Sequence, residues 1–410
     1  MTTLRQAAGA TARLCTSVVP DRTLARLVPA RLAWDPDAMR VARAPEADIR
    51  LLVGPVNSAG QGYAWARAVE RELDGVAAID LMVRDASTDR YGFPADVTVP
   101  VMGYTLAAQW QRAQAAAIRA GFSHVLLESG RFPYGSVPFQ SPRRVALGLE
   151  RAGVRVALVW HGSDIRVPSA HAATVADSPF GPRGTYPRRS VELLERNARA
   201  NRALIAATDF PVFVSTPGLL DVDRARWLPV VVDPERWAAP HAAMERDRPV
   251  VVYAPSNSPM KGADSIDEQL SVLEAQGLID YRRPGHTPSA QMPRIYGEAD
   301  IVLDQFRLGD YGVAACEAMA AGRLVIGHVS DEVRQHVAAA TGRELPVVES
   351  RLDDVGNTIR GILAEREMFR ARAAAGVSFV RAVHDGAMSA AVLAPFLGAS
   401  PRRPAPSADG

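Results

Sequence analysis

The sequence has little cysteine and almost no lysine. Its 410 residues include 2 cysteines, Cys15 and Cys316, which lie far apart and lack the spacing of metal ligands. This scarcity argues against a disulfide framework and a zinc site, and it suits a reducing compartment. Lysine and arginine together number 47, yet Lys261 is the only lysine. A single lysine in so arginine-rich a chain suggests a chemical role; an ordinary exposed lysine after a strand is the alternative.

The sequence also lacks the features of membrane-spanning, exported and nucleic-acid-binding proteins. No apolar run approaches the length that spans a bilayer, and the first residues contain no continuous apolar core followed by a cleavage site. The formal net charge is +2, and no basic run is interleaved with aromatic residues. We therefore expect a cytoplasmic protein with no nucleic-acid partner.

An N-terminal extension, residues 1–48, leaves one membrane question open. Up to residue 34 it carries several arginines and a single acid, Asp21. Such a basic amphipathic stretch either packs on its own domain or makes a weak peripheral contact with the inner face of an anionic membrane. Pro20 and Pro29 interrupt any long helix and so favour packing on the domain.

Apolar runs of strand length alternate with helical stretches from residue 49 onward. This alternation is typical of parallel sheets covered by helices on both faces, and it predicts an α/β fold. A polar, proline-bearing linker after residue 238 divides the series into two Rossmann-like domains. The predicted divisions are a first domain over 49–238, a second domain with terminal helices over 249–398, and a disordered tail over 399–410. The carboxyl ends of both sheets should meet at a shared cleft.

The first domain is predicted to contain seven strands and four main helices. The strands are expected over residues 49–56, 76–83, 97–101, 124–129, 154–160, 212–216 and 227–233. The helices are expected over residues 63–75, 104–121, 141–153 and 188–204.

The most specific pattern lies between Ala299 and His328, which reads as strand, loop, helix and strand. Gly312 precedes the helix, whose first N–H groups and positive dipole end suit an anion. Glu317 lies among alanines in that helix, and its carboxylate can accept hydrogen bonds from a diol such as a ribose. An ordinary solvated helix glutamate is the alternative interpretation.

The stretch GVAACEAMAAGRLVI within this segment resembles the donor-site motif of family 4 glycosyltransferases. ADIVLDQ and VVYAPSNSPMKG upstream follow the family's order, while WHGSDIR, VSTPGLL and WLPVVVDPERW are similar to its first-domain motifs. The resemblance covers residues 49–342. It implies the two-domain GT-B fold and transfer of a sugar from a nucleotide diphosphate sugar to an acceptor. It further implies retention at the anomeric carbon, with no metal and no cofactor.

The resemblance assigns roles to particular residues. Lys261 matches the family's lysine that reaches the donor diphosphate, where it would stabilise the charge on the leaving group. Ser256 and Asn257 can donate hydrogen bonds beside it. The donor-binding residues are therefore expected to be Gly60, Gly62, Ser256, Asn257, Lys261, Gly312, Val313 and Glu317.

On the first-domain side, His161 directly follows an apolar strand, at an end where a sheet displays ligand groups. His161 and Asp164 are expected to bind the acceptor, although capping of the local backbone is the alternative for both. Gly60 and Gly62 would let the backbone approach a phosphate or sugar, unless the loop is a plain β-to-α turn. His161 is also expected to act in catalysis, with Lys261 and Asp310.

Two positions depart from the family pattern. Gly309 stands where the first of two glutamates is expected, so Asp310 is expected to substitute in holding the sugar hydroxyls. Pro255 and Ser256 stand where an arginine often lies, so positive potential would rest on Lys261 or Arg307. These departures keep two alternatives open: a nucleotide-sugar epimerase of the same fold, and a degenerate binding subunit. The sequence does not fix the base, the donor sugar, the oligomeric state or the acceptor, whether glycan, lipid-linked or small molecule.

Overall fold

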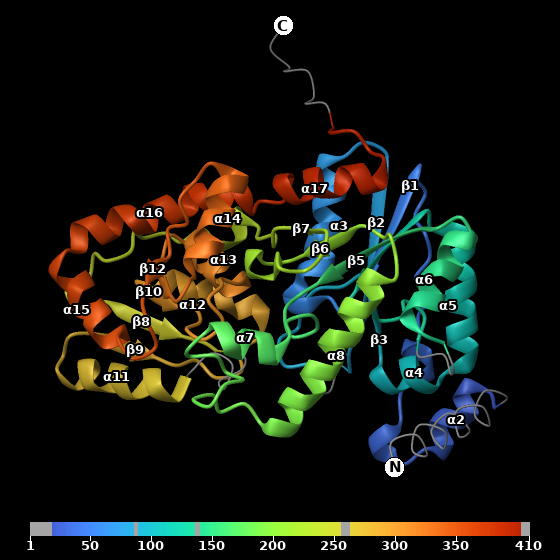
Figure 1. Ribbon diagram of the computed structural model, residues 1–410, viewed down its shortest axis with the longest axis horizontal. Coiled ribbons are helices and arrows are strands. Elements are labelled where there is room, and N and C mark those ends of the chain that lie inside the picture. Colours follow the sequence, from blue (N-terminus) through green and yellow to red (C-terminus); the bar gives the residue numbers. More distant parts are fainter. Residues whose placement is uncertain (1–18, 86–88, 136–139, 256–262, 403–410) are drawn as a thin grey trace, which may run out of the picture.

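The computed structural model describes residues 19–85, 89–135, 140–255 and 263–402. Figure 1 shows two α/β domains side by side, each built around one sheet. Every strand pair in both sheets is parallel. The predicted pair of parallel α/β domains is therefore confirmed.

The first domain contains a seven-stranded sheet in the order β3-β2-β1-β4-β5-β6-β7. Its strands are β1 (Ile49–Gly54), β2 (Val76–Val83), β3 (Val97–Val99), β4 (His124–Glu128), β5 (Arg155–Trp160), β6 (Val212–Val214) and β7 (Ala225–Trp227). Its helices are α2 (Asp21–Leu27), α3 (Gln61–Glu72), α4 (Val101–Leu106), α5 (Ala108–Gly121), α6 (Pro142–Arg151), α7 (Pro168–Thr174) and α8 (Arg188–Ala206).

The second domain contains a five-stranded sheet in the order β12-β11-β10-β8-β9. Its strands are β8 (Val250–Tyr253), β9 (Asp280–Arg282), β10 (Ile301–Leu303), β11 (Leu324–Gly327) and β12 (Val348–Glu349). Its helices are α11 (Ala263–Ala275), α12 (Met292–Glu298), α13 (Val313–Ala320), α14 (Asp331–Thr341), α15 (Val355–Ala364) and α16 (Arg366–Val383). The short helix α9 (Pro234–Trp237) connects the domains, and α17 (Ala387–Leu397) is the last helix.

Both faces of each sheet are buried, which explains the near-continuous apolar strands. In β4, Val125 and Leu127 join the cluster on one face, whereas Leu126 joins the cluster on the other. Successive residues of a strand point to opposite faces, so a strand covered by helices on both sides is apolar at every position.

The last helix departs from the predicted domain division. α17 packs against α3, and its Ala390, Leu393 and Phe396 share a core cluster with β1 of the first domain. Figure 1 shows α17 beside α3 after α16 has run along the second domain. The chain therefore returns to the first domain. Residues 399–402, predicted as part of the tail, continue this contact, because Arg402 N donates to Glu72 O at 2.8 Å.

The extension before β1 packs on its own domain over its described part. Leu24 of α2 is buried in the first-domain core. The Asp21 carboxylate accepts hydrogen bonds from the backbone N–H groups of Gln109 and Trp110, at 3.1 and 2.9 Å. This capping at the first turn of α5 helps to explain why the predicted helix over 104–121 divides at Ala107, where ψ is 87°. No helix in the described part of the chain is long and apolar enough to span a bilayer.

The predicted strand over 227–233 is wrong beyond Trp227, where β7 ends. The next six residues cross between the domains. Val231 N donates to the Gln61 side chain, and Val232 N donates to His384 O. The stretch is apolar because it lies between the two domain cores. Leu228 N still donates to Val214 O of β6, but the later hydrogen bonds go to other segments rather than to a neighbouring strand.

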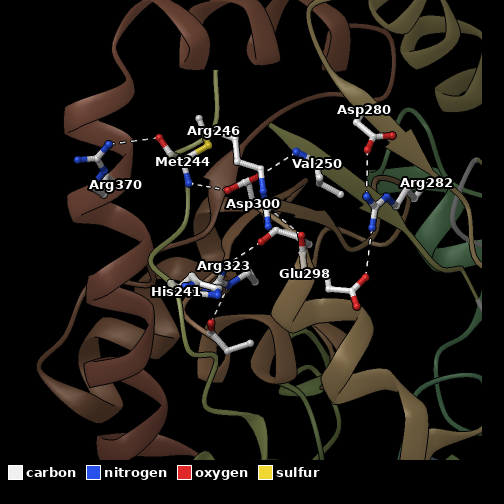
Figure 2. A network of polar contacts seen from close by, with 12 residues as sticks. His241, Met244, Arg246, Val250, Asp280, Arg282, Glu298, Asp300, Arg323 and Arg370 are labelled. Atoms are coloured by element: carbon white, nitrogen blue, oxygen red, sulfur yellow. Dashed lines mark hydrogen bonds and ion pairs between the residues drawn. The ribbon is translucent and has the colours of Figure 1, made fainter. Parts of the chain in front are cut away.

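A buried carboxylate fastens the interdomain linker to the second domain (Figure 2). Asp300 lies just before β10 and is only 1% exposed. Its carboxylate accepts hydrogen bonds from Met244 N, Val250 N and the Arg246 guanidinium, each at 2.8 Å. Three donors compensate for the cost of burying the charge. This clamp lies at the amino edge of the sheet, and the carboxyl edge at the cleft is left for ligands.

Candidate active site

Two adjoining cavities lie between the domains. The larger has a volume of about 560 Å³ and the smaller about 240 Å³. Residues from both domains line each of them, and both cavities share Ala59, Phe93, Ser289 and Glu317. We call the pair the donor cavities. Of the described donor-site candidates, Gly60, Gly312, Val313 and Glu317 line one or both.

The second-domain wall of the donor cavities is the start of α13. Gly312 precedes the helix, and its N–H donates to Asp304 Oδ2 at 3.1 Å. Val313 and Ala314 form the first turn, where backbone N–H groups lack partners within the helix, and both line the smaller cavity. Glu317 follows one turn later and lines both cavities. The structure thus brings together a helix start, which suits an anion, and a carboxylate, which suits hydroxyl groups.

The floor of the smaller cavity includes a loop that the sequence analysis did not select. Residues 285–287 follow β9 and line the cavity with Met292 and Tyr296. This loop region also touches the first domain, because Ser289 N donates to Tyr91 O at 2.6 Å. Its position at the carboxyl end of a strand and its glycine and proline content were the available signals.

The first-domain wall is the turn η3 (Ser58–Gly60), which joins β1 to α3. Ala59 and Gly60 have left-handed backbone conformations, with φ of 51° and 78°. A side chain at Gly60 would press on Phe93, at 3.1 Å. The tight turn therefore holds the backbone of Gly60 close to the cavity.

Gly62 is required by packing inside the first domain and not by the donor cavities. It does not line the donor cavities, and a Cβ atom there would collide with Asp80 Oδ1. Asp80 is fully buried on β2, and neither of its carboxylate oxygens has a hydrogen-bond partner among the described residues. Burial raises the pKa of Asp80 well above its usual range, and the charges of Glu128 and Asp96 add to the effect.

A buried glutamate, Glu128, organises the carboxyl ends of the first-domain strands. It ends β4 and is 0% exposed. Its Oε2 accepts the N–H groups of Val56 and Asn57, both at 2.7 Å, and its Oε1 lies 3.1 Å from His161 Nε2. The sequence analysis missed Glu128. The available signal was a carboxylate closing an otherwise apolar strand, because a buried charge requires partners.

His161 is held on two sides. Its ring stacks on Trp65 with centroids 5.7 Å apart and an angle of 11° between the planes. Burial by itself lowers the pKa of His161, but the hydrogen bond and charge of Glu128, together with the charge of Asp164, outweigh it and raise the pKa. His161 is thus a fixed imidazole that retains its proton more readily than an exposed histidine.

Asp164 has the local capping role that the sequence left as an alternative. Its carboxylate accepts the N–H groups of His161 and Gly162, at 3.0 and 2.9 Å, and the Ser129 hydroxyl at 2.6 Å. These bonds fix the loop that presents His161. Both residues line a cavity of about 350 Å³ inside the first domain, separate from the donor cavities.

Asp310 and Arg307 join the domains and do not line the donor cavities. Asp310 is 3% exposed, and its carboxylate lies 3.5 Å from the guanidinium of Arg166 in the first domain. Burial raises the pKa of Asp310, although the charge of Arg166 opposes the shift. Arg307 donates to the carbonyl oxygens of Asp177 and Arg183, at 3.2 and 3.3 Å. The position of Asp310 favours an interdomain contact over the expected sugar-binding role. The position of Arg307 likewise favours an interdomain contact over the expected supply of positive charge to the donor.

Three expected donor-site residues, Ser256, Asn257 and Lys261, lie outside the described residues. Pro255, immediately before them, lines the smaller donor cavity. Among the residues that the structure does describe, no three histidine, cysteine, aspartate or glutamate side chains form a group that could hold a metal ion.

Comparison with known proteins gives matches to structures only. No family model matches the sequence, and no curated protein matches it. HepE from Anabaena, in complex with UDP and glucose, matches with a TM-score of 0.54 and 11% identity over 85% of this chain and 98% of its own. Sucrose-phosphate synthase from Thermosynechococcus elongatus matches with a TM-score of 0.53 and 12% identity over 84% of this chain and 97% of its own.

A third match is an alpha-glucosyltransferase in complex with UDP and a 13-mer DNA, with a TM-score of 0.53 and 7% identity over 85% of this chain and 98% of its own. At these identities the likeness establishes the fold. The chain has the two-domain GT-B architecture that these glycosyltransferases share.

Proposed function

We propose that the protein is a glycosyltransferase that moves a sugar from a nucleotide diphosphate sugar to a hydroxyl-bearing acceptor. The observation that carries the proposal is the pairing of the α13 start with Glu317 in cavities between the two domains. A helix start binds phosphate groups, and a carboxylate one turn later binds a diol, which is the arrangement that a nucleotide diphosphate needs. HepE and the alpha-glucosyltransferase were both solved with UDP, which supports this class of donor.

The motif resemblance supplies the finer part of the proposal. On this resemblance we further propose membership of glycosyltransferase family 4, retention at the anomeric carbon and no metal requirement. Lys261 then meets the charge that develops on the departing diphosphate, and fixed cations and amide dipoles stabilise it. The second domain binds the nucleotide, and the first domain binds the acceptor. Proton NMR of the product anomer tests retention, and transfer in the presence of a chelator tests metal independence.

Glu317 offers the direct test of the donor site. Glu317→Gln removes the charge of the hydrogen-bond acceptor, so the affinity for UDP should fall by about 10- to 100-fold, since such bonds contribute about 1.5–3 kcal/mol. Isothermal titration calorimetry measures the affinity. Glu367→Gln is the matched control, because Glu367 is an exposed residue of α16, remote from the cavities. Equal UDP affinity in both variants would remove Glu317 from the donor site.

A second candidate function rests on Gly309 and Asp310. Asp310 faces Arg166, and Gly309 has no side chain, so the position of the first motif glutamate has no carboxylate directed at the donor. This observation favours a subunit that binds nucleotide sugars without turnover. Incubation with UDP-sugars, with and without acceptors, separates the possibilities. Transfer supports the first proposal, epimerised donor would indicate an epimerase, and binding without any product would indicate the subunit.

A further inference from the structure

A cavity of about 330 Å³ lies beside the linker that joins the two domains. Its walls are the linker over 238–243, the turn between α13 and β11, and α16. Only Pro234 and Arg381, among the described residues that line it, also line a donor cavity, the larger of the pair. We call this third compartment the linker cavity. It borders the donor site without being part of it.

The charged side chains of the linker cavity are all basic. Three arginines line it, Arg323, Arg370 and Arg381. His241 lines it too, and no aspartate or glutamate is among the described residues that do so. The rest of the lining is small or apolar, mostly alanine. A guanidinium carries a permanent charge and a fork of donors that fits phosphate and carboxylate groups. The lining therefore suits an oxyanion attached to a compact carbon skeleton.

Arg323 supplies a buried charge whose hydrogen-bond partners are all neutral. It is 2% exposed, and its guanidinium donates to Ala299 O at 2.8 Å and to Ala321 O at 2.7 Å. A further bond goes to His241 O of the linker (Figure 2). Burial lowers the pKa of Arg323, although the charge of Asp300 opposes the shift. Three other donors already engage that carboxylate, so an anion in the cavity would compensate the charge of Arg323.

Arg370 and Arg381 remain available to a ligand on the α16 side. Arg370 Nε is buried and has no hydrogen-bond partner in the part of the chain that the structure describes. The guanidinium lies 3.2 Å from Glu367, whose side chain is 86% exposed. Arg381 lies 2.7 Å from Glu235, whose side chain is 75% exposed. Ion pairs with such exposed carboxylates contribute little, so both arginines can bind an anion at small cost.

The linker next to the cavity holds an uncommon backbone conformation. Met244 has a φ of 66°, the left-handed region that residues with a side chain seldom adopt. Its N–H donates to Asp300 Oδ1 at 2.8 Å, and its carbonyl oxygen accepts from Arg370 Nη2 at 3.3 Å. Figure 2 shows Arg370 reaching Met244 from α16. Arg370 therefore connects the cavity to the segment that joins the domains.

We propose that the linker cavity binds a small metabolite bearing a phosphate or carboxylate group. Arg370 Nε–H donates to the oxyanion, Arg323 and Arg381 supply charge, and the alanines surround the carbon skeleton. The bound oxyanion joins α16 to the linker and to the turn before β11. This site is additional to the donor cavities, and it does not depend on the transferase function proposed above.

The experiment measures binding of inorganic phosphate, glycerol 3-phosphate and pyruvate to the full chain by isothermal titration calorimetry at constant ionic strength. Glycerol is the uncharged control. Each titration is run with and without saturating UDP, because UDP would displace phosphate bound at the start of α13. At least one of the three anions should bind, and its affinity should be the same within about threefold when UDP is present, about 0.65 kcal/mol.

Two variants of α16 locate the site. Arg370→Gln removes the Nε–H donor and the charge, so the anion affinity should fall by about 10- to 100-fold. Ala374→Glu places a carboxylate in the exposed wall of the cavity, and repulsion should lower the affinity by about tenfold. Arg372→Gln is the matched control, since Arg372 has similar exposure and a similarly unpartnered Nε but does not line the cavity. Ala375→Glu is the control for the added charge, and both controls should bind as the unchanged protein does.

The possible results separate this site from the proposed function. Equal anion affinity in Arg370→Gln and Arg372→Gln overturns the site, as does the absence of binding by all three anions. Displacement of the anion by UDP also overturns it, because the anion then lies in the donor cavities. Tighter binding of glycerol 3-phosphate than of pyruvate identifies a phosphate ligand, and the reverse identifies a carboxylate.

A protein that fails to bind UDP but still binds the anion through Arg370 loses the transferase proposal and keeps the linker site. Circular dichroism melting shows whether each variant is folded. Ala374→Glu changes an exposed alanine, so it still tests the site if Arg370→Gln does not fold.

Discussion

The two domains assemble their candidate ligand groups in different ways. The second domain concentrates Gly312, Val313 and Glu317 around one short helix start. The first domain joins Glu128 and His161, which lie 33 residues apart in the sequence and meet because β4 and β5 are neighbours in the sheet. A local motif thus makes one cluster, and tertiary pairing makes the other. This difference explains why a sequence motif pointed to the start of α13, while the partner of His161 stayed hidden.

Two histidines in the interior, His161 and His384, have pKa values shifted in opposite directions. His161 faces carboxylates, which raise its pKa after burial has lowered it. His384 lies between the domains, where its Nδ1 donates to Val230 O at 2.8 Å and its Nε2 lies 3.3 Å from the Tyr311 hydroxyl. Burial lowers the pKa of His384 to about 4. Burial by itself lowers the pKa of both histidines, and their partners decide the net direction.

The largest effect should come from Lys261, whose sequence position after β8 assigns it to the second domain. Lys261→Ala should lower kcat/KM by about 10²- to 10³-fold, or about 3 kcal/mol, because a fixed cation is lost from the developing diphosphate charge. Steady-state kinetics with a UDP-sugar measures the loss. The melting temperature should not change. An unfolded variant, or one with full activity, would contradict the role.

A smaller effect should distinguish two glycines that the sequence analysis assigned to the donor site. Gly62→Ala places a methyl group against the buried Asp80 carboxylate, so the free energy of unfolding should fall by about 1–3 kcal/mol, the usual cost of overpacking. Gly312→Ala is the matched control, because no atom lies within 4 Å of an added Cβ and its φ is −125°. Urea denaturation measures both. Equal destabilisation would contradict the packing role of Gly62 against Asp80.

The smallest expected effect is the dependence of stability on pH that the two histidines produce. The folded-state pKa of His384 lies below its unfolded value, so its stabilising contribution is present above pH 6.5 and is lost as the pH falls toward 4. The midpoint of urea denaturation should therefore decrease between pH 6.5 and 4.5. His384→Gln should reduce this dependence, by up to about 1.4 kcal/mol for each pKa unit.

His161 should behave in the opposite way in the same samples. Its folded-state pKa is raised, so its contribution is present below pH 6.5 and is lost as the pH rises through the folded value. NMR spectra of the histidine rings, assigned with His161→Gln and His384→Gln, report each titration directly. If the two rings titrate at the same pH, the opposite pKa shifts of His161 and His384 are contradicted.

Much of the fold could be read from periodicity. The strand predicted over 76–83 is β2, and the helix predicted over 188–204 is α8. Errors arose where burial came from contacts between distant segments. Residues 228–233 are as apolar as a strand because they lie between the two cores, and α17 returns to the first domain because its apolar side chains fit against α3.

Sequence by itself determined the alternation of strands and helices, the two-domain order and the glutamate-bearing helix, because each depends on residues within one turn, strand or helix of one another. Tertiary structure decided which charges meet. It turned Asp310 toward Arg166, gave Gly62 its packing role against Asp80, and set Glu128 behind His161. The physical reason is that hydrogen bonds and charge interactions act over a few ångströms in space, whatever the separation along the chain.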